Sequence, residues 1–255
     1  MTQLNKLYEL NKLTNGLSTM GLVTKIRPYV FFSALNTVWR KLDKSSKTIL
    51  DVGCGKGEPM AFINRQGKFR VVGIDIFRPY LEQARKKFYV LRRKRFLECH
   101  SEEQSDEESH IYTNIILGDA RYLPFKDKSF DAVICMEVLE HLEKEDGEKL
   151  LEELDRVARR QILVSTPVGK YEQHPFDGNP RQEHKHIWQV KELKERNYKI
   201  KGAGIKGLPR EEINSRFLRL LREALYVVGG FFSYNFSRIA CHMVAEKSIM
   251  KEKQN

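Results

Sequence analysis

Two patterns of apolar and polar residues, one typical of strands and one of helices, alternate along the middle of the chain. Short apolar runs of the kind found in buried β-strands occupy 48–52, 70–76, 114–120, 130–136 and 161–167. Segments with apolar residues at helical spacing lie between them, at 58–66, 78–94 and 148–160. Strands that alternate with helices in this way predict a parallel sheet with helices on both faces. Such sheets bind ligands at the carboxyl ends of their strands.

The pattern differs at the start of the chain and at one point inside it. Residues 1–44 carry leucine and aromatic residues at helical spacing, which predicts an N-terminal helical extension before one main domain over 45–255. Residues 92–110 are first basic and then strongly acidic. Charge blocks with few apolar residues are typical of exposed loops, so we expect a charged insertion there.

The last third of the chain resumes the alternation after an irregular stretch rich in Gly, Pro and His. The pattern predicts a helix over 189–197 and a strand over 198–208. A basic amphipathic helix over 210–228 follows, inside a helical insertion that we place at 208–236. The segment 237–248 supplies the final strand.

Composition narrows the class of protein. The 255 residues are 41% hydrophobic and 31% charged, which fits a globular protein and excludes a disordered one. The four cysteines form no C-x-x-C pair, which argues against a zinc ribbon and predicts a cytoplasmic protein. The longest apolar stretch, Ala224 to Phe236, is too short and too interrupted by glycine to cross a bilayer. The net charge of +11 favours anionic partners, although a solvated lysine-rich surface explains it equally well.

The candidate chemistry begins in the stretch "TILDVGCGKGEP", Thr48 to Pro59. Gly53, Gly55 and Gly57 let the backbone turn sharply and let a ligand approach it closely. Asp51 precedes them and would repel a diphosphate, but it suits a cationic group such as an amino-acid ammonium.

Two further aspartates follow at the ends of the next predicted strands. Asp75 is placed to accept hydrogen bonds from ribose hydroxyls, as acidic residues do at the end of the second strand of nucleotide-binding sheets. Asp119 is placed to accept from an exocyclic adenine amine. Ribose, adenine and an amino-acid group together describe S-adenosylmethionine.

The ordered motifs "ILDVGCGKG", "VVGIDI", "LGDARYLPF", "FDAVICMEVLEHL" and "ILVSTP" resemble those of class I S-adenosylmethionine-dependent methyltransferases. The resemblance implies a Rossmann-like sandwich with a mostly parallel seven-stranded sheet and an antiparallel last strand. It also implies an enzyme that transfers a methyl group from this cofactor. By the same resemblance the cofactor-binding residues are Asp51, Gly53, Cys54, Gly55, Gly57, Asp75, Ile76, Asp119, Ala120, Met136 and Glu137.

Two polar clusters are candidates for binding or activating the methyl acceptor. "EVLEHL" contains Glu137, Glu140 and His141, the candidate catalytic residues, with His141 suited to act as a general base. "NPRQEHKHIW" contains His184. The combined pattern is similar to the small-RNA 3′-terminal 2′-O-methyltransferases, which would make Glu137, Glu140, His141 and His184 ligands of a magnesium-type ion.

Three interpretations of the function remain open at this point. We favour a small-molecule or lipid acceptor and no metal ion, because "EVLEHL" also occurs in methyltransferases of that kind. Metal-assisted 2′-O-methylation of RNA is the alternative, and a regulator that binds the cofactor without turnover is a second alternative. For the basic apolar segment Arg216 to Phe232 we favour a helix packed between the last two strands, and contact with an anionic membrane or with a hydrophobic substrate remains open.

Overall fold

The computed structural model describes residues 33–65, 67–98, 113–170, 173–175, 177–206 and 216–249. Most of the predicted N-terminal extension and most of the charged segment 92–110 lie outside the described residues. The described part of the extension is α3 (Ala34–Lys41), whose first turn is capped by the Ser33 side chain.

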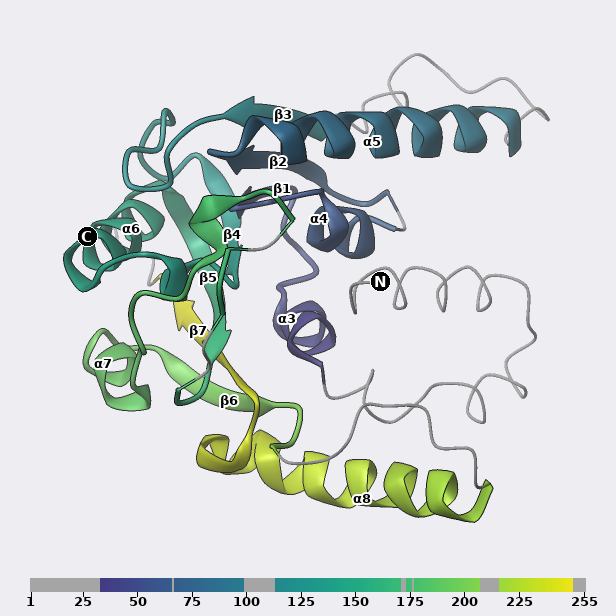
Figure 1. Ribbon diagram of the computed structural model, residues 1–255. Helices are drawn as coiled ribbons and strands as arrows, with labels where there is room; N and C mark the ends of the chain where they lie inside the picture. Colours follow the sequence, from purple (N-terminus) through teal and green to yellow (C-terminus); the bar gives the residue numbers. More distant parts are fainter. Residues whose placement is uncertain are drawn as a thin grey trace.

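A single seven-stranded sheet forms the centre of the molecule, in the order β3-β2-β1-β4-β5-β7-β6 (Figure 1). Its strands are β1 (Thr48–Val52), β2 (Arg70–Asp75), β3 (Thr113–Leu117), β4 (Phe130–Met136), β5 (Ala158–Pro167), β6 (Lys199–Ala203) and β7 (His242–Ser248). Neighbouring strands from β3 to β5 pair in parallel, whereas β7 runs antiparallel to both β5 and β6. The predicted mostly parallel sheet with an antiparallel last strand is confirmed.

Helices cover both faces of this sheet. They are α3, α4 (Glu58–Ile63), α5 (Arg78–Glu98), α6 (Lys144–Val157), α7 (Val190–Glu195) and α8 (Arg216–Asn235), with short 3₁₀ helices η2 (Leu139–His141), η3 (Pro180–Gln182) and η4 (Ser237–Ile239). One apolar cluster joins the sheet to α3, α4 and α5, and a second joins it to α6 and α7. Among the described residues, no helix is long and apolar enough to cross a membrane.

The sequence explains why β4 occupies the middle of the sheet. Its residues from Phe130 to Cys135 are all buried, so both faces of the strand contact a helical layer. A continuous apolar run is what such a doubly covered parallel strand requires. In α6, by contrast, only one face is apolar, and Leu150, Leu154 and Val157 bury it against the sheet.

Several element boundaries differ from the predicted ones; for example, Ser237–Ile239 forms η4 and the last strand begins only at His242. The helix predicted to end at Lys94, just inside the expected charged insertion, continues to Glu98 as α5, because arginine and lysine are good helix formers. The helix predicted to end at Arg160 ends at Val157, and Ala158 already pairs with Phe130 as the start of β5. Pairing in the sheet overrides local helical preference there.

Candidate active site

The glycine turn joins β1 to α4 at the carboxyl edge of the sheet. Gly53, Gly55 and Gly57 have φ angles of 72°, 52° and 77°, a region that side chains with a Cβ rarely adopt. The Gly53 amide donates to the carbonyl of Ile74 at 2.8 Å, which ties the turn to β2. A Cβ on Gly53 would lie 2.2 Å from Cγ2 of Val138, so the turn also touches the loop after β4.

Asp51 lies beneath this turn and is fully buried. Within the described part of the chain, neither of its carboxylate oxygens has a hydrogen-bond partner. Burial, with added repulsion from Asp75 and Glu58, raises the pKa of Asp51 well above its usual range. An unpaired buried carboxylate is costly, so a cationic ligand group beside it would be stabilising.

Asp75 ends β2 and holds the glycine turn in place. Its carboxylate accepts from the amides of Gly55 and Phe77, both at 2.8 Å. Burial raises the pKa of Asp75. Ile76 follows on the surface, 37% exposed. Asp75 therefore shapes the turn as well as standing where the ribose contact was predicted.

Asp119 follows β3 and is engaged by an arginine that the sequence analysis left out. Arg121 donates through Nη2 to Asp119 at 2.6 Å and through Nη1 to Asp146 at 2.7 Å. The hydrogen bonds from Arg121 hold the pKa of Asp119 below its usual range. Ala120, between Asp119 and Arg121 in the chain, is half-buried. The predicted contact of Asp119 with an adenine amine remains a prediction.

Glu137 follows β4 with a positive φ angle of 55°, which is uncommon for a residue with a side chain. Its carboxylate accepts from Ser165 Oγ at 2.6 Å and lies 3.1 Å from Nε2 of His242. Burial alone would raise the pKa of Glu137, but His242 and Ser165 outweigh it and hold the pKa below its usual range. Sequence reasoning missed both partners because they come from other strands, β5 and β7.

Three potential metal ligands converge beside Glu137. One donor atom each from Glu140, His141 and His184 lies within 4.8 Å of the others. Thr166 donates to a carboxylate oxygen of Glu140 at 3.0 Å. Burial, with added repulsion from Glu137, raises the pKa of Glu140 well above its usual range.

The backbone fixes which nitrogen of His141 is available. Nδ1 of His141 lies 3.0 Å from the carbonyl oxygen of Glu183. Because a carbonyl only accepts, Nδ1 carries the proton and Nε2 keeps its lone pair. Burial also lowers the pKa of His141, which favours the neutral ring. His141 can therefore bind a cation or accept a proton through Nε2.

The segment 183–188 carries His184 to this place and is held there by backbone contacts. The amide of Lys185 donates to the carbonyl of Glu140 at 2.7 Å. Nε1 of the buried Trp188 donates to the carbonyl of Leu139 at 3.1 Å. The Trp188 ring packs so closely on Gly147 that a Cβ there would lie 2.4 Å from it. These contacts join two sequence motifs that are more than forty residues apart.

Comparison with known sequences points to one family. Residues 50–163 match the family model described as "Methyltransferase domain". Methyltransferase GfsG of Streptomyces halstedii is 32% identical over 123 residues, 48% of this chain and 38% of the relative. A ubiquinone biosynthesis O-methyltransferase of Rickettsia bellii is 27% identical over 175 residues, 65% of this chain and 62% of the relative. The chain spans between a third and a half of the length of the first relatives that it matches.

Solved structures agree on the fold. A structure of a complex between the Haloferax volcanii Trm112 methyltransferase activator and a putative methyltransferase matches with a TM-score of 0.54 at 15% identity. That match covers 89% of this chain and 92% of the other. The methyltransferase domain of bacterial CtHen1 matches with a TM-score of 0.51 at 19% identity, covering 84% and 97%. At these identities the matches identify the architecture alone.

Proposed function

We propose that this chain, which carries a class I S-adenosylmethionine-dependent methyltransferase domain, is an O-methyltransferase for acceptors with two adjacent hydroxyl groups. The acceptor would be oriented by a divalent cation bound to Glu140, His141 and His184. The observation that carries the proposal is the convergence of these three side chains within 4.8 Å. Glu140 and His141 follow closely after Val138 in the chain, and the side chain of Val138 contacts the glycine turn.

The residues around the turn fit the cofactor. The orphaned carboxylate of Asp51 would accept the ammonium group at the methionine end. Gly55 leaves room for the cofactor to approach the backbone, and Asp75 would face the ribose. When bound, S-adenosylmethionine supplies a methyl group that its sulfonium already activates. The protein then has to hold the acceptor oxygen in line with that methyl group and remove its proton.

The polar cluster fits a divalent cation that accepts imidazole nitrogen as well as carboxylate oxygen, such as Mn²⁺. Its donors are one carboxylate and two imidazoles, and a second carboxylate, Glu137, lies at its edge. When bound, such a cation supplies a Lewis acid that lowers the pKa of a coordinated hydroxyl group. Glu137, which Ser165 and His242 orient, would accept the hydroxyl proton.

Two sources of adjacent hydroxyls suit this site. The terminal ribose of RNA carries a cis-diol, and the pattern shared with the small-RNA methyltransferases together with the net charge of +11 supports it. A small-molecule catechol offers the same chemistry, and the similarity to a ubiquinone biosynthesis O-methyltransferase supports a small acceptor. The adjacent oxygens are common to both, so the first test compares the two directly.

The experiment measures transfer of labelled methyl groups to an RNA oligonucleotide with a free 2′,3′-diol and to a catechol. We expect transfer to one of them with Mn²⁺ or Mg²⁺ and loss of transfer with EDTA. An oligonucleotide ending in a 3′-phosphate lacks the diol and serves as the matched negative substrate. His184→Ala should lower turnover at least a hundredfold and leave S-adenosylmethionine affinity unchanged by calorimetry, because His184 lies outside the glycine turn.

The exposed His174 provides the control, since His174→Ala removes an imidazole outside the cluster and should change neither quantity. Methyl transfer that chelators do not affect would exclude the cation from the proposal. Absence of cofactor binding at millimolar concentration would exclude the methyltransferase activity itself.

A further inference from the structure

The outer face of α8 is apolar and exposed. Of the twelve large apolar side chains exposed among the described residues, eight lie on α8 and the adjoining η4. On α8 they are Leu218, Leu221, Leu225, Val228, Phe231 and Phe232, each between 47% and 64% exposed. At about 100° of rotation per residue they span an arc of roughly 140° on one side of the helix.

The described buried face of α8 contains Tyr226 and, at its closest contacts with the sheet, small residues. Gly202 of β6 approaches α8 so closely that a Cβ there would lie 1.9 Å from the carbonyl oxygen of Ser233. A Cβ on Gly229 would lie 2.5 Å from Ile205. Helices of globular proteins normally bury their large apolar side chains, whereas these six on α8 are exposed. A contiguous exposed apolar face of this kind marks an interaction surface.

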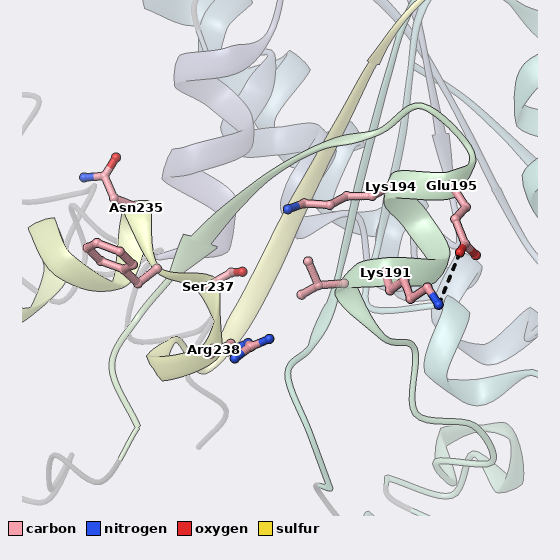
Figure 2. Close-up of a pocket in the computed structure, with 8 residues that line it drawn as sticks. Lys191, Lys194, Glu195, Asn235, Ser237 and Arg238 are labelled. Atoms are coloured by element: carbon pink, nitrogen blue, oxygen red, sulfur yellow. Dashed lines mark ion pairs between the residues drawn. The ribbon is translucent and has the colours of Figure 1, made fainter.

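A cationic cleft adjoins the end of this face. The cleft, of about 810 Å³, is lined by α7 and by the last turn of α8 with η4. Figure 2 shows Lys194 extending from α7 toward α8 and Arg238 reaching from η4 toward α7. Lys191 pairs with Glu195 at 3.7 Å, whereas Lys194 and Arg238 have no acidic partner within 4.0 Å in the part of the chain that is described. Phe236, 63% exposed, connects the cleft to the apolar face.

We propose that the outer face of α8 and this cationic cleft dock the protein on an anionic lipid bilayer. Large apolar side chains beside cations are the combination that lets a helix lie in a membrane interface. The apolar residues would enter the acyl boundary while Lys194 and Arg238 bind lipid phosphates. The proposal goes beyond the methyl-transfer reaction and does not depend on it.

Two features favour a bilayer over a second copy of the chain. The apolar arc is wider than the two-position seam of a paired helix, and it continues onto η4 through Phe236 and Ile239. The face also ends in a cation-bearing cleft, which an apolar dimer seam does not require. An anionic surface instead neutralises those cations.

The test is flotation of the full chain with phosphatidylcholine vesicles that contain either no phosphatidylserine or 30% phosphatidylserine. We expect binding to the anionic vesicles alone, with part of it surviving 0.5 M NaCl because apolar burial is not screened. The double substitution Leu221→Ser/Leu225→Ser should reduce binding at least tenfold. Leu117→Ser is the matched control, because Leu117 is equally exposed, at 45%, on strand β3 at the other edge of the sheet.

Two charge-reversal variants test whether the cleft contributes to vesicle binding. Lys194→Glu should weaken binding to anionic vesicles about fivefold, whereas Lys126→Glu, on an exposed loop elsewhere, should have little effect. Thermal melts should be unchanged by all of these substitutions, because the side chains face outward.

Three outcomes would overturn the proposal. The first is no binding to anionic vesicles. The second is a dimer in light scattering that the α8 double variant dissociates, which would assign the face to a second copy. The third is unchanged vesicle binding in that variant with weaker retention on RNA, which would assign the surface to nucleic acid.

Discussion

Gly53 shows how one residue connects the glycine turn after β1 to the loop after β4. It has a positive φ angle, and it also lies against Val138, so a Cβ would be both strained and obstructed. We expect Gly53→Ala to lower the free energy of unfolding by about 3 kcal/mol, of which the backbone conformation alone accounts for about 1 kcal/mol. Urea unfolding of the cofactor-free protein measures this loss.

A substitution at Gly178 separates the cost of the positive φ angle from the cost of the steric clash. Its φ angle is 70°, but no atom lies within 4 Å of where its Cβ would be, so Gly178→Ala tests the conformational cost alone. Val138→Ala in the Gly53→Ala background should recover part of the larger loss. Equal losses for the two alanine variants would show that Val138 does not restrict Gly53.

Asp51 makes stability depend on pH and on the cofactor. Its pKa in the folded protein is raised, whereas in the unfolded chain it lies at about 4. Its contribution to stability is therefore present below pH 4 and is lost as the pH rises toward the folded pKa. We expect the melting temperature of the cofactor-free protein to fall between pH 5 and pH 8, and to fall less in Asp51→Asn.

Asp51→Asn should also bind S-adenosylmethionine at least tenfold more weakly, because the ammonium group of the cofactor loses its carboxylate acceptor. Asp127→Asn removes a carboxylate whose side chain is 73% exposed and controls for the change in net charge. A pH profile of Asp51→Asn that matches the wild type would contradict the buried, unpaired state of Asp51.

At the scale of elements, the cluster depends on how the segment 183–188 is attached to η2. Trp188→Phe would keep an aromatic ring against Gly147 but remove the hydrogen bond to Leu139. We expect a loss of about 1 kcal/mol in unfolding free energy and weaker Mn²⁺ binding, with cofactor affinity unchanged. Titration with Mn²⁺ followed by paramagnetic broadening measures the affinity directly.

Trp39 offers a control of the same chemistry. It packs edge-on against Phe62 and Phe69 in the cluster on the other face of the sheet. Trp39→Phe should change stability without changing Mn²⁺ affinity. If Trp188→Phe also left that affinity unchanged, the attachment of the segment would not determine the position of His184.

For the whole molecule, the cofactor should stabilise the sheet as one unit. The turn that would hold it lies at the end of β1, a central strand that contacts both helical layers. At a hundred times its dissociation constant, S-adenosylmethionine should add about 2.7 kcal/mol to the unfolding free energy and raise the melting temperature by about 5–10 °C. Far-UV circular dichroism and tryptophan fluorescence should shift together, because Trp39 and Trp188 lie on opposite faces of the sheet. Two separate transitions, of which one responds to the cofactor, would contradict a single cooperative unit.

The sequence by itself determined the order of strands and helices along the chain and the position of the glycine turn. Apolar runs such as Phe130 to Cys135 and the helical spacing of Leu150, Leu154 and Val157 are local patterns, and each predicted its element correctly. The roles of the glycines and of Asp75 in the turn were also predictable from short stretches of sequence. Glycine favours a positive φ angle, and the apolar run before Asp75 marks the end of a strand. Boundaries near Lys94 and at Ala158 were less accurate, since helix propensity extends α5 to Glu98 and sheet pairing ends α6 before Ala158.

Only the tertiary structure decided how the acceptor side is assembled. His184 reaches Glu140 and His141 through Trp188 and the carbonyl of Glu140, contacts that no spacing along the chain specifies. His242 and Ser165 orient Glu137 from two other strands, and the other side of α8 lies against Gly202 of β6. Periodicity shows that a helix has an apolar face, but the direction of that face is fixed by what the opposite side can pack against.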